Sequence, residues 1–221
     1  MKKIAIAIDG PAGAGKSSVS KIIANRLGYA YLDTGAMYRA VTYIVLIENI
    51  SGDEAIAKRA AAMDMEVRPE DGVMHVVVDG NDVTAHIRSG EVSSAVSAVS
   101  AIAGVRSAMI AIQRRQAEKG GIVLDGRDIG TTVLPNADVK IFLTASIHTR
   151  AVRRFAELKE KEPSLTLDKV EADIEKRDYA DSHREVSPLQ QADDAHRVDN
   201  SHMTLNETAE EIIRICHEVC G

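Results

Sequence analysis

The stretch IAIAIDGPAGAGKSS, residues 4 to 18, decides how the rest of the chain is interpreted. Its unbroken apolar run from Ile4 to Ile8 is typical of a strand buried on both faces of a parallel sheet. Residues 10–17 then match G-x-x-x-x-G-K-[ST] at every fixed position, and a helical pattern starts at Ser17. In such a loop, glycines let backbone N–H groups turn toward phosphate oxygens, and the positive end of the next helix adds to the attraction. The stretch therefore predicts a loop that binds the phosphates of ATP or GTP.

Individual side chains of this loop have expected partners. Lys16 is expected to reach the β- and γ-phosphates, the Ser17 hydroxyl to ligate Mg²⁺, and Ser18 to lie near the α-phosphate. Glycine-rich turns before helices are common, but the complete pattern between a strand and a helix favours nucleotide binding over a plain turn. The residues expected to hold ATP are Gly10, Pro11, Ala12, Gly13, Ala14, Gly15, Lys16, Ser17 and Ser18.

Composition excludes several other classes. The 221 residues are 45% hydrophobic and 27% charged, which suits one soluble domain or one domain with an insert. A net charge of -6 argues against a general binder of polyanions, and the absence of Trp among few aromatics argues against a stacking platform for nucleic acid. The apolar run before Asp9 is too short for a signal peptide or a membrane span. We therefore expect a cytoplasmic protein with no nucleic-acid or membrane partner.

Two cysteines lie near the C-terminus, at Cys216 and Cys220, with His217 between them. A metal site is conceivable there, but structural zinc usually takes four ligands, so two small residues on a buried helical stripe are favoured. Nothing in this usage suggests a disulfide scaffold, which fits a reducing compartment. A capping-box pattern at Thr204 and Glu207 predicts the start of that helix. Its expected buried stripe comprises Ala209, Ile212, Ile213, Cys216, Val219 and Cys220.

The rest of the chain alternates strand and helix patterns. Further strands are expected within 29–33, 121–128, 138–146 and 196–201, which predicts an α/β fold with a parallel five-stranded sheet flanked by helices. Residues 65–89 break the rhythm, since three β-type runs separated by turn signals predict a small antiparallel insert. The charged segment 148–164 predicts a helix that Pro163 and Ser164 end.

The loop alone does not say where the phosphoryl group goes. The chain contains no Asn-Lys dipeptide, which argues against a GTPase switch. The strand at 121–125 ends in Asp-Gly-Arg-Asp and not in the Asp-Glu of a motor ATPase, and an arginine there favours a second anion. Arg39 and Arg127 follow predicted strand ends, where ligands of parallel sheets bind. Arg150, Arg153 and Arg154 are expected on one face of the charged helix. A kinase for a small anionic acceptor is therefore favoured.

Five motifs together resemble bacterial cytidylate kinases, in order and across nearly the whole chain. They are DGPAGAGKSS (9–18), YLDTGAMYRA (31–40), DGRDIGTTVLP (125–135), VKIFLTAS (139–146) and KRDYADSHR (176–184). The second and third are far more specific than the phosphate loop. The resemblance implies a three-layer P-loop kinase with a short lid that transfers the γ-phosphate of ATP to CMP or dCMP, with Mg²⁺.

The resemblance also implies roles for individual residues. Arg39 would clamp the CMP phosphate, and Ser97 and Arg106 would read the cytosine. The implied CMP-binding set is Thr34, Arg39, Ser97, Arg106, Arg127, Asp128, Arg177, Asp181 and Arg184. The implied catalytic set, acting by charge stabilisation, is Lys16, Arg127, Arg150, Arg154 and Arg177, with Arg153 on ATP. Ser17 is the expected metal ligand, and Asp125 is a second candidate whose setting also suits a plain turn.

The implied organisation is a single kinase domain over residues 1–221, functioning as a monomer. Its core would comprise 1–33, 98–149 and 190–221, its monophosphate-binding region 34–97, and its lid with the following arginine-rich segment 150–189. No general base is expected, because the attacking phosphate oxygen is already anionic. Kinases for UMP or AMP, a nucleotide-dependent switch and a structural protein with a vestigial loop stay open as alternatives.

Overall fold

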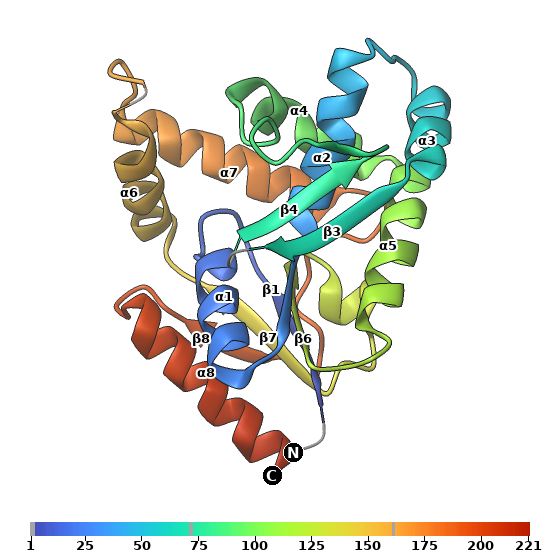
Figure 1. The fold of residues 1–221 in the computed structure, drawn as a ribbon. Coiled ribbons are helices and arrows are strands. Elements are labelled where there is room, and N and C mark those ends of the chain that lie inside the picture. Colours follow the sequence, from blue (N-terminus) through green and yellow to red (C-terminus); the bar gives the residue numbers. More distant parts are fainter. Residues whose placement is uncertain (1–2, 71–72, 161) are drawn as a thin grey trace.

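A sheet of five parallel strands forms the centre of the computed structural model, which describes residues 3–70, 73–160 and 162–221. In order across the sheet the strands are β2 (Ala30–Asp33), β6 (Ile122–Gly126), β1 (Ala5–Asp9), β7 (Val139–Thr144) and β8 (His196–Asp199) (Figure 1). The apolar run after the N-terminus is the central strand, and Ile6 is in register with Val123 of β6 and Val139 of β7. The predicted parallel α/β sheet is confirmed.

Side chains alternate across the sheet and build a core on each face. Ile6 and Ile8 of β1 pack with Val123 of β6 against α1 (Lys16–Leu27) and α8 (Leu205–Cys220). Ala7 and Leu124, which point the other way, pack against α2 (Thr34–Ile47) and α5 (Ala103–Ala117). Every β1 side chain from residue 6 to residue 9 is buried, as expected for a strand covered on both faces.

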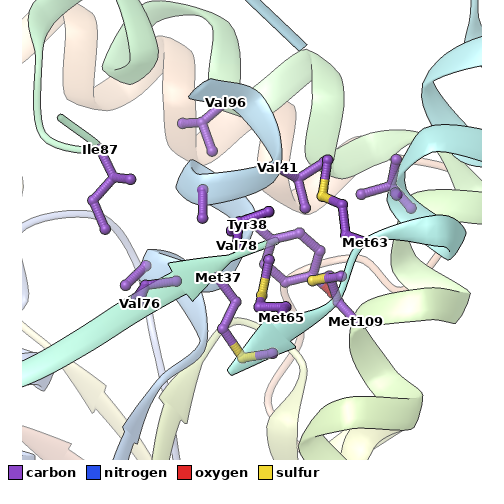
Figure 2. Packing of buried hydrophobic residues seen from close by; sticks show 14 of the residues in the cluster. Met37, Tyr38, Val41, Met63, Met65, Val76, Val78, Ile87, Val96 and Met109 are labelled. Carbon is purple, nitrogen blue, oxygen red and sulfur yellow. The ribbon is translucent and has the colours of Figure 1, made fainter. Parts of the chain in front are cut away.

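The insert is a three-stranded antiparallel sheet of β3 (Met65–Glu70), β4 (Val73–Val78) and β5 (Asn81–Asp82). It follows α3 (Asp53–Ala62) and precedes α4 (Gly90–Ala101). Its inner face closes the second core, in which four methionines meet (Figure 2). These are Met37 of α2, Met63, Met65 of β3 and Met109 of α5. The insert is therefore packed onto the helices around it.

Two long helices form an arm over the sheet. α6 (Ile147–Leu158) packs on α7 (Leu167–His183), which runs across the molecule toward α4 (Figure 1). Between them Ala151, Val170 and Ile174 form a small core of their own. A single turn of π-helix, η1 (Ile129–Val133), follows β6. Among the described residues no single helix is long and apolar enough to cross a membrane, although α4 and α5, bent 94° apart, pass that test as a pair.

Three predicted boundaries were wrong. The charged helix ends at Leu158, before Pro163; its last side chain in the small core with α7 is Phe155, and a turn follows at residues 159 and 160. The third run of the insert is a strand only at Asn81–Asp82, and Val83 and Ile87 enter the core from turns. Three members of the expected α8 stripe are not buried: Ile213 is half-buried, and Val219 and Cys220 are exposed, whereas Ile215, outside the expected stripe, is buried. Burial ends at Cys216 because the last turn lies at the rim of the core.

Candidate functional site

The phosphate loop follows β1 at the carboxyl edge of the sheet, where all five strands end. Gly10 lies so close to β7 that a Cβ would come within 1.9 Å of the carbonyl oxygen of Leu143, so only glycine fits there. Gly15 caps α1 with a φ of 84°, in the left-handed region that favours glycine. The loop and the start of α1 therefore have the backbone shape that the sequence predicts.

Lys16 is buried at the start of α1. Its Nζ donates to the carbonyl oxygens of Gly10 and Pro11, both at 2.7 Å. Burial lowers the pKa of the Lys16 ammonium well below its usual range, and the nearby Arg127 guanidinium lowers it further. The lysine thus lies folded over its own loop in a place where an anion would stabilise its charge.

Ser17 shares a hydrogen-bond network with Asp125 at the end of β6. The Ser17 hydroxyl donates to Asp125 Oδ2 at 2.9 Å, and the Tyr31 hydroxyl donates to Oδ1 at 2.7 Å. Burial, followed by the charge of Asp33, raises the pKa of Asp125 to about 6. A hydroxyl beside a carboxylate is an oxygen donor set that suits Mg²⁺, so these residues fit the metal that the sequence motif implies.

Asp33 organises the end of β2. Its carboxylate accepts the backbone N–H of Ala36 at 2.8 Å and so caps α2. Arg39 and Arg88 both donate to Asp33 Oδ2 at 3.1 Å, Arg39 from α2 and Arg88 from the segment before α4. The Nε of Arg39 is buried without a hydrogen-bond partner among the described residues. Thr34, next to this cluster, donates to the carbonyl oxygen of Asp125 at 2.8 Å.

Asp128, which follows β6, joins two arginines that the sequence places far apart. It accepts a hydrogen bond from Arg106 of α5 and another from Arg184 at 3.4 Å. Arg106 is 1% exposed, lies over the ring of Tyr38 at 5.3 Å and donates to the carbonyl oxygen of Ser100 at 3.2 Å. Ser97, half-buried one turn earlier on α4, lies near this point.

Arg127 and Arg177 lie between the phosphate loop and Arg39, and with Lys16 and Arg39 they form a cationic cluster. Arg127 donates to Asp181 of α7 at 2.8 Å, and this carboxylate together with its neighbours outweighs the effect of burial and raises the pKa of Arg127. Burial and the charge of Arg127 lower the pKa of Arg177 to about 10. The Nε of Arg177 is also buried without a hydrogen-bond partner in the described part of the chain. This cluster is therefore electrostatically crowded in the absence of a bound anion.

Asp9 connects the two sides of the site. Its carboxylate accepts the backbone N–H groups of Ile129 and Gly130, at 2.8 and 2.7 Å, so β1 is bonded to the turn after β6. Burial raises the pKa of Asp9 to about 6, against the lowering effect of those two hydrogen bonds. The start of the phosphate loop and the segment carrying Arg127 are thus held in a fixed relation.

The three arginines of α6 contact different partners in the structure. Arg150 is buried against the phosphate loop, where its Nη1 donates to the carbonyl oxygen of Ala12 at 2.8 Å. Arg153 donates to Asn200 after β8, at 2.8 and 3.1 Å, and Asn200 in turn donates to the carbonyl oxygen of Ala14. Arg154 is exposed and pairs with Glu157 of its own helix. Arg153 and Arg154 reach different partners because consecutive side chains of an α-helix leave its axis about 100° apart.

The family model described as cytidylate kinase matches residues 6–218 of this chain. The chain belongs to the cytidylate kinase family. It is 50% identical over 220 residues to a cytidylate kinase of Ligilactobacillus salivarius, covering 99% of this chain and 98% of that one. It is 47% identical over 214 residues to a cytidylate kinase of Bacillus subtilis, covering 96% of each.

Solved structures extend the likeness in fold. Shikimate kinase from Acinetobacter baumannii, in complex with shikimate, matches with a TM-score of 0.51 at 14% identity over 98% of this chain and 94% of that one. An uncharacterized protein from Eubacterium ventriosum matches with a TM-score of 0.52 at 12% identity, over 98% and 99%. These chains share the architecture of this cytidylate kinase family member. At such low identities the likeness concerns the fold alone.

Several residues of the site in this cytidylate kinase family member were not predicted from the sequence. Asp33, Arg88 and Asn200 each bond two parts of the site, and Tyr31 orients Asp125. Asp33 stands inside the motif LDTGAMYR, so its position directly after β2 was the available signal. Arg88 and Asn200 lie outside the five motifs quoted above. Asn200 follows directly after β8, and the fold brings both residues to the site.

Proposed function

We propose that this protein transfers the γ-phosphoryl group of ATP to CMP and dCMP, forming CDP and dCDP. One observation carries the proposal beyond family membership: a phosphate loop with its lysine and a cluster of buried or half-buried arginines meet at one edge of the sheet. Lys16 belongs to the first, and Arg39, Arg127 and Arg177 belong to the second. Two anionic nucleotides need such a place, since catalysis of phosphoryl transfer is mostly positioning and charge stabilisation.

On the donor side, the backbone N–H groups of the loop and the start of α1 bind the ATP phosphates. Lys16 exchanges its bonds to Gly10 and Pro11 for phosphate oxygens, which restores a stable charge to its ammonium. Ser17 and Asp125 are the residues that would hold Mg²⁺. When bound, Mg²⁺ neutralises charge on the phosphate oxygens.

On the acceptor side, we assign the CMP phosphate to Arg39 and Arg127, with Arg177 facing the transferred group. In the free protein the carboxylates of Asp33 and Asp181 accept the hydrogen bonds of Arg39 and Arg127, so phosphate binding replaces one anion by another. We assign the cytosine to Ser97 and Arg106, and the sugar hydroxyls to Asp128 and Asp181. No residue needs to remove a proton, because the attacking oxygen belongs to an ionised phosphate.

We further propose that residues 34–97 hold the monophosphate, that 150–189 form a lid, and that one chain is a complete cytoplasmic enzyme. Closure of α6 and α7 over ATP would exclude water and bring Arg154 toward the transferred group. The residues that we assign to the two nucleotides all come from a single chain, which supports function as a monomer.

A coupled assay with ATP, Mg²⁺ and a panel of CMP, dCMP, UMP and AMP tests the proposal. We expect CMP and dCMP to give the highest kcat/KM. A preference for AMP or UMP would contradict the assigned acceptor, and ATP hydrolysis that no acceptor stimulates would favour a nucleotide-dependent switch.

A further inference from the structure

The backbone of Ala12, in the middle of the phosphate loop, is held by hydrogen bonds to both of its polar groups. Its N–H donates to Asp178 Oδ1 of α7 at 2.9 Å, and its carbonyl oxygen accepts from Arg150 Nη1 of α6 at 2.8 Å. Arg150 Nη1 also donates to Asp178 Oδ2 at 2.5 Å. The three groups therefore form a closed ring of hydrogen bonds that joins the loop to both helices of the arm.

The ring lies inside the protein. The Arg150 side chain is 5% exposed and that of Asp178 is 19% exposed, whereas Arg154, one turn later on α6, is 43% exposed. Arg150 Nε donates to the carbonyl oxygen of Ala145 at 3.0 Å, which fixes the guanidinium at the start of its helix. Gly13 lies against α6 at the same point, since a Cβ there would come within 3.3 Å of Arg150 Cβ.

Charge-assisted hydrogen bonds between buried groups are stronger than neutral ones and depend steeply on geometry. A loop rich in glycine has many backbone conformations of similar energy, so its shape for phosphate depends on contacts from outside. Most of the loop is held by its own helix and by Lys16. The arm fixes the loop at Ala12, because the N–H and the carbonyl oxygen of this residue, which belong to two adjacent peptide units, are both engaged.

We propose that Arg150 and Asp178 are a positioning pair that holds the Ala12 peptide, and with it the phosphate loop, in the shape that binds ATP. This differs from the charge-stabilising role expected for Arg150, because its Nε is bonded to Ala145 and its Nη1 to both the loop and Asp178. Asp178 also stands between Arg177 and the Arg127 partner Asp181 on α7. The same helix thus carries the loop's support and part of the acceptor cluster. The inference rests on the proposed function only in taking ATP as the donor.

The test compares Asp178→Asn, Arg150→Met and the double variant with wild type. Asp173→Asn and Arg214→Met are matched controls, since these residues form exposed ion pairs with Lys169 and with Glu211 and lie outside the site. Binding of a non-hydrolysable ATP analogue is measured by calorimetry, together with kcat, the KM for ATP, the KM for CMP and the melting temperature.

We expect each single variant to weaken analogue binding about tenfold and to raise the KM for ATP, while the KM for CMP changes less than threefold. The double variant should be no weaker than the weaker single variant, because both changes open the same ring. Additive losses, equal losses for ATP and CMP, or a lower melting temperature with unchanged analogue binding would each overturn the inference. Absence of CMP turnover in wild type would contradict the proposed function alone, since analogue binding tests the pair without it.

Discussion

The two sides of the site, the phosphate loop and the arginine cluster, use different chemical groups to bind an anion. The donor side is made of backbone: glycines, the start of α1 and one lysine bonded to its own loop. The proposed acceptor side is made of side chains from distant segments, and its Arg39, Arg106 and Arg127 are bonded to carboxylates. A backbone site is encoded by one short stretch and carries little charge of its own, whereas a side-chain site depends on the whole fold and keeps like charges close together.

This difference has an energetic consequence in the free protein. Burial and mutual repulsion lower the pKa values of Lys16, Arg39 and Arg177, so holding these cations together costs folding free energy. The carboxylates of Asp33, Asp125 and Asp181 offset part of that cost. Nucleotide phosphates should offset the remainder, and four changes test how far the two sides differ.

The largest effect is expected from Lys16→Ala on the donor side. Loss of the one cation within the loop should lower kcat by about 10³-fold or more, with about 4 kcal/mol of transition-state stabilisation lost. Steady-state kinetics with CMP measure it, and Lys169→Ala, an exposed lysine on α7, is the control. A loss below tenfold would mean that the backbone alone binds the transferred group.

Arg177→Ala should come next. We expect kcat/KM for CMP to fall by 10² to 10³-fold, because one group facing the transition state is worth a few kcal/mol. The melting temperature of the free protein should not fall, because the change removes a cation whose pKa is already lowered by burial and by Arg127. Near-normal turnover would show that the acceptor clamp lies elsewhere.

Asp9→Asn tests the connection between the phosphate loop and the segment after β6, through the pH dependence of the unfolding free energy. The pKa of Asp9 is raised from 3.8 to about 6 in the folded protein, so its contribution to stability is present below pH 3.8 and is lost as pH rises through about 6. The variant lacks this titration. Its unfolding free energy relative to wild type should therefore rise by roughly 2 to 3 kcal/mol between pH 4 and pH 7. Denaturant unfolding at both pH values measures this, and a constant difference would contradict it.

The smallest effect is expected for the residue proposed to bind the cytosine. Ser97→Ala should raise the KM for CMP about tenfold, as expected for one lost hydrogen bond to a bound ligand, and change the KM for ATP less than threefold. Ser94→Ala, on the same helix with its hydroxyl bonded to the carbonyl oxygen of Gly90, is the control. Equal changes in the two KM values would argue against reading of the cytosine by Ser97.

Much of the fold was predictable because local rules decide it. The apolar run of β1, the phosphate-loop pattern and the capping box at Thr204 each act over a few residues, and all three are confirmed as structural features. The end of α6 and the exposure of Val219 were not predictable in this way. They depend on where the neighbouring α7 and the rim of the core lie, which periodicity does not report.

The site also combines features set by a few neighbouring residues with features set by the packing of distant segments. The donor loop could be placed from sequence alone, whereas the acceptor residues came from the resemblance to a family. Asp178 stood inside a quoted motif without an expected role, because only the packing of α7 on the loop brings it to Ala12. Arg88 had no sequence signal that separates it from a surface arginine, and its ion pair with Asp33 appears only in the folded chain.

The position of β1 also sets an order of events during synthesis. This strand is made before the other strands of its sheet, and both of its neighbours, β6 and β7, begin more than a hundred residues later. At about 5 to 20 residues per second, the ribosome needs several seconds or longer before Ile6 can pair with Val123. During that interval two apolar edges stay unpaired, while α2, α3 and the hairpin of β3 and β4 can form from contacts close in sequence. The first strand of the sheet to be made is therefore among the last to be fully paired.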